Sequence, residues 1–394
     1  MITTTFKGKT LPMLGLGAMR LPMNPDKTID KLQTAEMIRL AMASGLNYFD
    51  TAYPYHGGLS EVVLCEILRE YPRESWYLAD KYPGHQISST YNPAEIFEDQ
   101  LKKCGVEYFD FYLLHNVYEN SMDVYMDEKW GIIDYFRRQR ELGRIRHLGF
   151  STHAAPDTIE KFLTLCPDME FCQIQLNWLD WTLQDAKRTV AILNAKNVPI
   201  WVMEPLRGGK LCRLSDEDEA ALKVMRPEES IPGWSFRFVQ DVPGVAMILS
   251  GMSEVSQLTE NLAVFAEKKP LTDAEREKLF EIAEGMKDSV PCTGCGYCLA
   301  ECPKSLDIPR MMTTYNEIRI MPNTNAVMYL ETASSDRWPS ACISCGKCAK
   351  ICPQSIDIPT VMKDFAERFD KIPKWTEISR EREELARKLK EANK

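Results

Sequence analysis

The stretch NYFDTAYPYHGGLSEVVLCEILREYPRESWYLADK (residues 47–81) holds the unit from which the fold can be predicted. It begins and ends with short apolar runs, NYFDTA (47–52) and WYLADK (76–81), which are typical of strands. Between them, SEVVLCEILREY (60–71) has apolar residues at three- and four-residue spacing, which predicts a helix. A strand, a helix and a second strand in this order favour a parallel sheet.

The same alternation continues through residue 251. Six further strand-like runs are LPMLGLGAM (11–19), FDFYLLH (109–115), RHLGFS (146–151), FCQIQLN (171–177), PIWVMEPL (199–206) and VAMILSG (245–251). Helix-like segments such as TAEMIRLAMASG (34–45) and NPAEIFEDQLKKCG (92–105) lie between them and end at glycine. Eight such units in about 250 residues predict a closed (β/α)8 TIM barrel. The alternative is a doubly wound open sheet, which the absence of a G-x-G-x-x-G fingerprint disfavours.

The character of the chain changes after residue 270. LTDAEREKLFEIAEGMKD (271–288) predicts a charged amphipathic helix, and the stretches 310–340 and 360–394 also read as helical. We therefore expect an α/β barrel domain over residues 1–285 and a small, mainly α-helical domain over residues 286–394.

Bulk composition excludes several classes of partner. The net charge of −9 provides no basic excess for nucleic acid or an anionic membrane surface. No apolar run approaches the roughly 20 residues that span a bilayer, and the N-terminus lacks the pattern of a signal peptide. We expect a cytoplasmic protein with reduced cysteines. Five scattered cysteines, Cys65, Cys104, Cys166, Cys172 and Cys212, are expected to be small buried hydrophobic residues.

The other eight cysteines form two runs, CTGCGYCLAECP (292–303) and CISCGKCAKICP (342–353). Both have the form C-x2-C-x2-C-x3-C-P and continue into an S-x-D-I-P tail, so they are an internal repeat. In such runs three thiolates bind one cluster and the fourth typically binds the other. The predicted ligand sets of two [4Fe–4S] clusters are Cys292, Cys295, Cys298 and Cys352 for the first, and Cys342, Cys345, Cys348 and Cys302 for the second.

The alternative for these runs is zinc, since a C-x2-C pair can be half of a zinc ribbon. Zinc needs four ligands in two pairs, whereas each run supplies three close thiolates and a fourth, which favours iron–sulfur. The runs resemble bacterial two-cluster ferredoxins. Their D-I-P tails and the longer insert between them resemble the helical ferredoxin modules of respiratory and heterodisulfide-reductase-type subunits. That resemblance implies transfer of single electrons.

Polar residues follow three consecutive strands of the predicted barrel, at the end where such barrels have active sites. The second strand is followed by Asp50 and Tyr55, the third carries Lys81 at its end, and the fourth is followed by His115. A tyrosine with a pKa of about 10 is a poor acid at neutral pH, but a neighbouring ammonium stabilises its phenolate. A carboxylate can hold the lysine, and a neutral histidine can orient a carbonyl oxygen. These four residues predict a device for protonating a carbonyl oxygen while hydride arrives at carbon.

Each of these residues also has a structural interpretation when taken alone. Asp50 could cap a strand end, Lys81 could be a solvated edge charge, and His115 could be a satisfied core histidine. Tyr53 is an alternative proton donor, and we place Tyr55 first because of its spacing from Asp50. The remaining histidines are expected to be surface or packing residues: His56, His85, His147 and His153.

Several segments resemble the aldo-keto reductase family, in its ferredoxin-fused branch. They are GKTLPMLGLGAMRLP (8–22), YFDTAYPYHGGLSE (48–61), LHN (114–116), HLGFSTH (147–153), FCQIQLNWLD (171–180), MEPLRGGKL (203–211) and LSGMSEVSQLTENL (249–262). The resemblance covers roughly residues 1–285 and implies that Asp50, Tyr55, Lys81 and His115 form the family's catalytic tetrad.

The resemblance also implies NADPH or NADH lying across the barrel mouth. The nicotinamide carboxamide would contact Ser151 and Gln173, and the phosphates would pass the EPLRGG loop (204–209). The full set of implied nucleotide contacts is Gly17, Met19, Ser151, Gln173, Met203, Pro205, Leu206, Gly208, Gln257 and Asn261. Met203 stands where the family commonly has an aromatic residue. Gln257 stands where it commonly has an arginine for the 2′-phosphate, so the sequence leaves the choice of nucleotide open.

Three functional hypotheses follow. The first is a carbonyl reductase or alcohol dehydrogenase with a small-molecule carbonyl or alcohol substrate. Its clusters would be structural or would connect to a redox partner protein. The second is a ferredoxin-coupled oxidoreductase with flavin as a further candidate cofactor, because nicotinamide moves two electrons and each cluster moves one. The third is a non-catalytic nucleotide-sensing barrel with an electron-transfer docking module.

Overall fold

The computed structural model describes residues 1–392 except 87, 120, 287–289, 291, 293, 321, 323 and 353. The chain divides into two units, Met1–Leu279 and Phe280–Lys394. The predicted boundary at residue 285 lies inside helix α12 (Asp273–Met286), which begins in the first unit. None of the described helices combines the length and the apolar character that a bilayer crossing requires.

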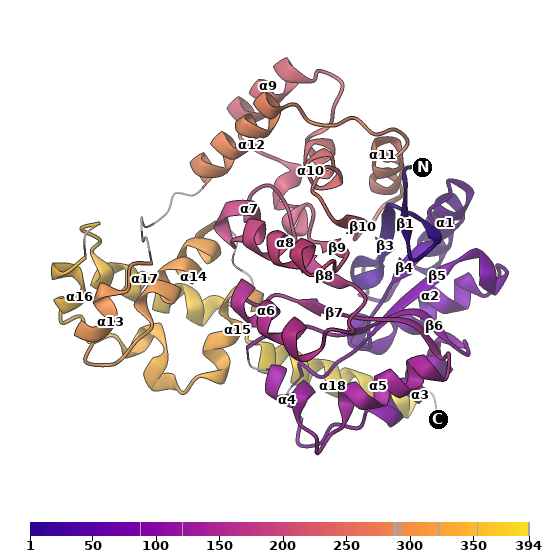
Figure 1. The fold of residues 1–394 in the computed structure, drawn as a ribbon, viewed down its shortest axis with the longest axis horizontal. Coiled ribbons are helices and arrows are strands. Elements are labelled where there is room, and N and C mark those ends of the chain that lie inside the picture. The colour runs from indigo at the N-terminus through magenta and orange to yellow at the C-terminus, as the bar shows by residue number, and fades with distance from the viewer. Residues whose placement is uncertain are drawn as a thin grey trace. The chain divides into compact units, whose positions relative to one another are not determined.

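Eight parallel strands close into a barrel in the first unit, in the order β10-β3-β4-β5-β6-β7-β8-β9 (Figure 1). Each strand lies within or overlaps one of the eight strand-like runs, so the prediction of a (β/α)8 barrel is confirmed and the open sheet is excluded. The strands are β3 (Leu14–Gly17), β4 (Tyr48–Asp50), β5 (Tyr77–Tyr82), β6 (Phe109–Leu114), β7 (Ile145–Thr152), β8 (Cys172–Gln175), β9 (Ile200–Met203) and β10 (Val245–Ser250).

An antiparallel hairpin of β1 (Thr3–Phe6) and β2 (Lys9–Pro12) precedes the barrel. The predicted first strand over 11–19 therefore corresponds to the end of β2 and the whole of β3. The Phe6 ring packs 5.0 Å from the rings of Trp201 and His147, and Trp201 Nε1 donates a hydrogen bond to the Tyr48 hydroxyl at 3.0 Å. The hairpin thus fills the N-terminal end of the barrel with aromatic side chains. The opposite end is where the strands present polar residues.

Helices follow the strands and surround the barrel (Figure 1). They are α1 (Lys31–Ala43), α2 (Ser60–Leu68), α3 (Pro93–Cys104), α4 (Met122–Met126), α5 (Ile132–Glu141), α6 (Pro156–Leu165), α7 (Asp180–Leu183), α8 (Ala186–Ala195), α9 (Asp216–Met225), α10 (Ile231–Gln240), α11 (Val255–Val264) and α12. Short 3-10 helices are η1 (Ala18–Arg20), η2 (Tyr55–Gly58), η3 (Arg73–Ser75) and η4 (Arg207–Cys212). Helix α3 illustrates the local rules: the Asn92 side chain caps its start, and it ends at Gly105 with a left-handed φ of 63°.

The described part of the second unit contains helices and no strands, as the sequence predicts. Its helices are α13 (Tyr297–Glu301), α14 (Ile308–Ile320), α15 (Thr324–Thr332), η5 (Ser335–Arg337), η6 (Pro339–Ala341), α16 (Lys347–Lys350), α17 (Ile358–Lys371) and α18 (Trp375–Ala392). Its core combines aliphatic and aromatic side chains with the buried thiols of Cys298 and Cys348. Four further cysteines of the two runs pack against this core, so six of the eight contribute to the interior of the unit, whereas Cys295 and Cys345 are exposed.

Candidate functional site

The alternation of side chains along the strands places three predicted tetrad residues at one end of the barrel interior. Asp50, Lys81 and His115 each follow, by two residues, a side chain of the interior core, and alternate residues of a strand face the same side. Those core residues are Tyr48, Ala79 and Leu113. Strand register brings the ends together, since Asp50 pairs with Ala79, and the His115 N–H donates to the Tyr82 carbonyl at 3.0 Å.

Lys81 and Asp50 form a buried ion pair. Lys81 Nζ lies 2.5 Å from Asp50 Oδ1 and 2.7 Å from the Thr51 carbonyl oxygen. The side chains are 0% and 4% exposed. Burial is the largest single influence and lowers the pKa of Lys81, but Asp50, Tyr55 and Asp80 together outweigh it, so the pKa is raised above its usual value. Lys81 is therefore a charged ammonium inside the barrel, which excludes the solvated edge charge considered as an alternative.

Tyr55 and His115 complete the group around this ammonium. Lys81 Nζ lies 5.0 Å from the centre of the Tyr55 ring, and the Tyr55 and His115 ring centres are 5.8 Å apart. Tyr53, the alternative donor, instead packs against Lys103 of α3, whose Nζ is 4.0 Å from its ring centre. The structure therefore brings Asp50, Tyr55, Lys81 and His115 together. Tyr53 packs against Lys103 and is not part of this group.

A buried polar network lies behind Lys81, on the helix side of β5. Gln100 Nε2 donates to the Lys81 carbonyl at 3.1 Å and to Glu61 Oε1 at 3.0 Å, and Lys103 Nζ lies 3.0 Å from Glu61 Oε2. Burial and the Glu61 charge raise the pKa of Asp80 well above its usual value. This network fixes the backbone that carries Lys81, and the sequence analysis did not anticipate it.

A large cleft opens at the C-terminal ends of β9 and β10, with a volume of about 470 Å³. Its lining includes five of the residues that the resemblance implies as nucleotide contacts, namely Pro205, Leu206, Gly208, Gln257 and Asn261. The other five lie elsewhere at this end of the barrel or next to it: Gly17 ends β3, Met19 lies in η1, Ser151 is in β7, Gln173 is in β8 and Met203 ends β9.

The loop on one side of this cleft is held by a buried ion pair. Arg207 Nε lies 3.0 Å from Asp180 Oδ1, and both side chains are almost completely buried. Asp180 also accepts hydrogen bonds from Gln175 and Asn177, each at 2.7 Å. The next residue, Gly208, has a φ of 64°, a conformation that glycine adopts without strain. This anchor gives the loop one defined path beside the cleft.

The charges around the cleft are mainly acidic. Glu204 and Glu260 line it, and among its described lining residues Arg20 is the one cation. Arg20 Nη2 lies 3.7 Å from a Glu204 carboxylate oxygen. Gln257 accepts a hydrogen bond from the Ser253 N–H at 2.8 Å, at the start of α11. The cleft is therefore weakly equipped to neutralise an additional phosphate.

Gln173 has a buried polar atom that fits an amide ligand. Its side chain is 3% exposed, and its Oε1 has no hydrogen-bond partner among the described residues. A buried acceptor without a partner is unfavourable, and the NH2 group of a carboxamide would satisfy it. Ser151 is less available, because its hydroxyl accepts a hydrogen bond from the Asn116 N–H at 2.9 Å. The residues present therefore fit a nicotinamide carboxamide at Gln173.

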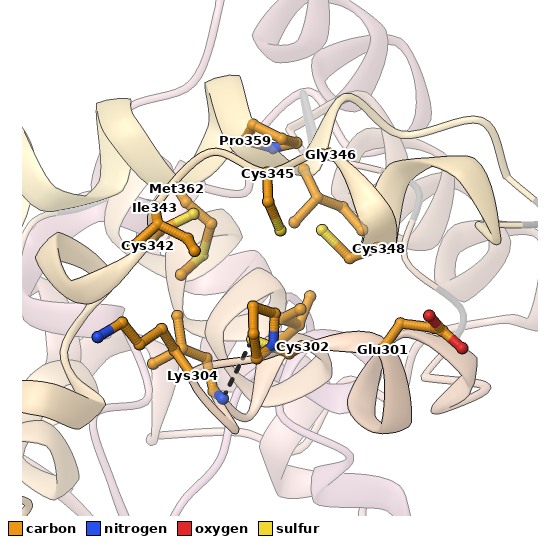
Figure 2. Close-up of a pocket in the computed structure, with 14 residues that line it drawn as sticks. Glu301, Cys302, Lys304, Cys342, Ile343, Cys345, Gly346, Cys348, Pro359 and Met362 are labelled. Carbon is orange, nitrogen blue, oxygen red and sulfur yellow. Dashed lines mark hydrogen bonds between the residues drawn. The ribbon is translucent and has the colours of Figure 1, made fainter.

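The eight run cysteines line two pockets of the second unit. One pocket of about 360 Å³ is lined by Cys302, Cys342, Cys345 and Cys348, and their side chains face one another across it in Figure 2. The other, of about 340 Å³, is lined by Cys292, Cys295, Cys298 and Cys352. Each pocket thus takes three cysteines from one run and the last cysteine from the other run. No three His, Cys, Asp or Glu side chains among the described residues form a group that could hold a single metal ion. A four-iron cluster takes one thiolate at each iron, so its ligands lie further apart than those of a single ion.

The two runs make the same loop. Gly296 and its counterpart Gly346 have φ angles of 79° and 72°, which permit the tight turn before the third cysteine. Burial raises the pKa of the Cys298 thiol to about 11 and also raises that of Cys348. Thiolates at these positions need a nearby positive charge, and iron ions supply one. The donor set of each pocket therefore fits an iron–sulfur cluster.

Comparison with known families gives an independent result for the barrel. The family model described as "Aldo/keto reductase family" matches residues 13–284, more than half of the chain. The chain belongs to the aldo/keto reductase family. A second model, described as "4Fe-4S dicluster domain", matches residues 291–356. The aldo/keto reductase barrel is thus joined to a ferredoxin-type iron–sulfur domain, as the sequence predicts for the ferredoxin-fused branch.

Known relatives share the barrel at low identity. A "Probable aldo-keto reductase 1" from Glycine max is 26% identical over 52% of this chain and 58% of that protein, so the chain spans little more than half of it. An "NADH-specific methylglyoxal reductase" from Escherichia coli is 24% identical over 71% of this chain and 96% of that protein. The solved aldo-keto reductase AKR11C1 from Bacillus halodurans is 21% identical, with a TM-score of 0.59 over 72% of this chain and 96% of that chain.

Some residues around the aldo/keto reductase site carried no recognisable sequence signal. His85 was expected to be a surface or packing residue, and it packs directly on His115. Tyr125 of α4 donates to the carbonyl oxygen of His115 at 2.7 Å. Neither lies in a motif, because both reach the site through loops and a short helix. The sequence analysis did not consider Gly84, although an isolated glycine can mark close packing, and a Cβ added there would lie 2.6 Å from the Tyr125 ring.

Proposed function

We propose that this aldo/keto reductase reduces a small-molecule carbonyl, or oxidises the corresponding alcohol, with NADH or NADPH. The observation that carries the proposal is the position of the Lys81 ammonium, 2.5 Å from Asp50 and 5.0 Å from the Tyr55 ring centre. A charged lysine is costly inside a barrel, and its placement beside a tyrosine is chemically useful.

In the direction of reduction, the Tyr55 hydroxyl gives its proton to the carbonyl oxygen. Lys81 stabilises the phenolate that remains, and Asp50 holds Lys81 in place. His115 donates a hydrogen bond to the same oxygen and orients the carbonyl. A bound reduced nicotinamide would supply the hydride to the carbonyl carbon. The product is the alcohol, and Tyr55 regains a proton from solvent.

The nucleotide is proposed to lie in the cleft between the EPLRGG loop and α11, with its carboxamide at Gln173. Support comes from the unpartnered Gln173 oxygen and from the position of five implied contacts in the cleft. Four further nucleotide contacts stay predictions, namely those of Gly17, Met19, Ser151 and Met203. Similarity to the Escherichia coli relative, which is named as an NADH-specific reductase, also supports a nicotinamide nucleotide.

The second unit is proposed to hold two [4Fe–4S] clusters, with the last cysteine of each run exchanged between them. The two cysteine pockets support these ligand sets. Each cluster would carry one electron at a time. Exposed apolar side chains near the cysteines support a redox partner protein, because such surfaces commonly bind proteins. They are Tyr297, Leu299, Ile343 and Ile351.

Flavin stays a candidate for coupling two-electron and one-electron steps, and the predicted domain boundary and cytoplasmic location stay predictions. A barrel that only senses nucleotide remains the competing function. It predicts nucleotide binding without turnover.

Matched variants Tyr55→Phe and Tyr53→Phe test the proposed reaction. With methylglyoxal and 9,10-phenanthrenequinone as carbonyl probes, Tyr55→Phe should lose about 10²- to 10⁴-fold in turnover, the usual contribution of a proton donor. Tyr53→Phe should keep its activity, and both should keep the visible absorption of the clusters. Retained turnover in Tyr55→Phe would remove Tyr55 from the role of proton donor. Nucleotide binding without turnover in the unsubstituted protein would favour the sensing function.

A further inference from the structure

A second imidazole lies directly against the tetrad histidine. The ring centres of His85 and His115 are 4.5 Å apart with planes at 64°, and His85 is only 5% exposed. His85 belongs to the loop that follows β5, whereas His115 follows β6. Neither the family match nor the implied tetrad assigns this residue a role.

The backbone around both rings is held in one arrangement. The Tyr125 hydroxyl donates to the carbonyl oxygens of His115, at 2.7 Å, and of Tyr82, at 3.1 Å. It therefore joins the ends of β5 and β6. The residue before His85 is Gly84, where an added Cβ would lie 2.6 Å from the Tyr125 ring. Only glycine fits beneath that ring, so the packing of Tyr125 on Gly84 sets the position of His85.

The groups around His115 are themselves charged or titratable, so the protonation state of His115 affects them. The Tyr55 ring of η2 lies 5.8 Å from the His115 ring, and Lys81 of β5, paired with Asp50 of β4, lies 5.0 Å from the Tyr55 ring centre. His85 packs on the His115 ring, and Tyr125 of α4 contacts the His115 carbonyl. Two imidazoles at this distance oppose double protonation, because like charges repel strongly in a poorly solvated site.

We propose that His85 is a positioning residue that fixes the ring plane of His115 and keeps His115 uncharged near neutral pH. This inference rests on the proposed carbonyl reduction, in which His115 donates one hydrogen bond to the substrate oxygen. A charged His115 would add a second cation beside Tyr55 and favour the phenolate, which has no proton to give. His85 prevents that state.

The test replaces the second imidazole and follows the protonation of His115. His85→Phe keeps an aromatic ring against His115, and His85→Asn serves as the alternative if the bulkier ring impairs folding. His147→Gln is the matched control, because His147 packs against Phe6 at the opposite end of the barrel. The chain has only five histidines, so ring-nitrogen NMR of the intact, oxidised protein can resolve each titration.

In either His85 variant, His115 should protonate at a higher pH than in the unsubstituted protein. Turnover of methylglyoxal should fall roughly fivefold more between pH 8 and pH 6, with KM little changed. His147→Gln should show neither effect. An unchanged His115 titration in both variants, or an unchanged pH profile of turnover, would overturn the inference. A shifted titration in a protein that reduces no carbonyl probe would support the coupling of the rings and contradict the proposed function instead.

Discussion

The barrel and the cysteine unit build their polar centres in opposite ways. The barrel site gathers Asp50, Lys81 and His115 from the ends of three strands, and the core beneath them consists of aromatic and aliphatic side chains. The second unit builds its core partly from the candidate ligands themselves, with Cys298 and Cys348 buried in it. A site placed on a finished scaffold can be changed without loss of the fold. A site that forms part of the core cannot be removed without loss of the fold. The two units should therefore respond differently when their site residues or bound groups are removed.

Removal of iron should have the largest effect and should separate the two units. After anaerobic treatment with an oxidant and a chelator, we expect residues 280–394 to lose most of their amide-exchange protection. The physical reason is that the free energy of cluster binding contributes directly to the free energy of folding when the ligands form the core. Hydrogen-exchange mass spectrometry should find the strands β3–β10 as protected as before. A second unit that keeps its amide-exchange protection without iron would contradict the claim that its fold depends on the clusters.

The exchanged ligands can be tested in the same unit. Cys302→Ser and Cys342→Ser should remove the same cluster, and Cys352→Ser should remove the other one, because the last cysteine of each run belongs to the opposite pocket. Iron should fall from about eight to about four atoms per chain in each variant. Electron paramagnetic resonance of the reduced protein identifies the surviving signal. Loss of the same signal in Cys352→Ser and Cys342→Ser would show that each run binds its own cluster. Cys212→Ser is the control.

Lys81→Met tests how much the barrel depends on its own buried charge. The change leaves the Asp50 carboxylate buried without its partner, so we expect about 3–5 kcal/mol of lost stability with turnover abolished. Lys31→Met is the matched control, since its pair with Glu66 at 2.7 Å is half exposed and worth at most about 1 kcal/mol. Chemical denaturation monitored by far-ultraviolet circular dichroism measures both. Equal losses in the two variants would contradict a special role for the buried pair.

If the cleft binds the nucleotide as proposed, it should prefer NADH, because Glu204 pairs with its one described cation, Arg20. Gln257→Arg adds a guanidinium that can bind the 2′-phosphate of NADPH, and should improve NADPH binding by roughly tenfold relative to NADH. Gln257→Met is the uncharged control. Fluorescence titration with each nucleotide measures the ratio. A wild-type protein that binds NADPH more tightly would show that groups outside the described cleft neutralise the phosphate.

The smallest effect is expected where α12 joins the barrel. Hydrogen bonds from Arg226 lower the pKa of Glu275 to about 2, although burial opposes this. A lowered folded-state pKa adds stability above about pH 4.3, the ordinary glutamate value, and that stability is lost as the pH falls toward 2. Glu275→Gln should lower Tm by about 2 °C at pH 7, with the difference shrinking below pH 4. The control is Glu267→Gln at an exposed side chain, which should change neither Tm at pH 7 nor its dependence on pH. A difference that does not depend on pH would assign the loss to packing.

The sequence alone determined the parts of this protein that depend on short-range pattern. Strand and helix periodicity predicted all eight barrel strands, and eight β/α units without a G-x-G-x-x-G fingerprint favoured a closed barrel over an open sheet. The C-x2-C-x2-C-x3-C-P repeat predicted an iron–sulfur domain, because three of the four ligands of a cluster lie within one loop. The positions of Asp50, Lys81 and His115 at strand ends also followed from sequence, whereas Tyr55 lies in η2 and the catalytic roles of all four stay predictions.

Tertiary structure decided what depends on contacts between distant segments. It placed Tyr55 near Lys81 and Tyr53 near Lys103. The two tyrosines are only two residues apart in sequence, yet they contact different lysines. It joined Arg207 to Asp180, and it packed His85 against His115 through the contact of Tyr125 with Gly84. The direction of a side chain in an irregular loop depends on what packs against it from elsewhere in the fold. No local pattern carries that information, so these roles appeared only once the barrel had closed.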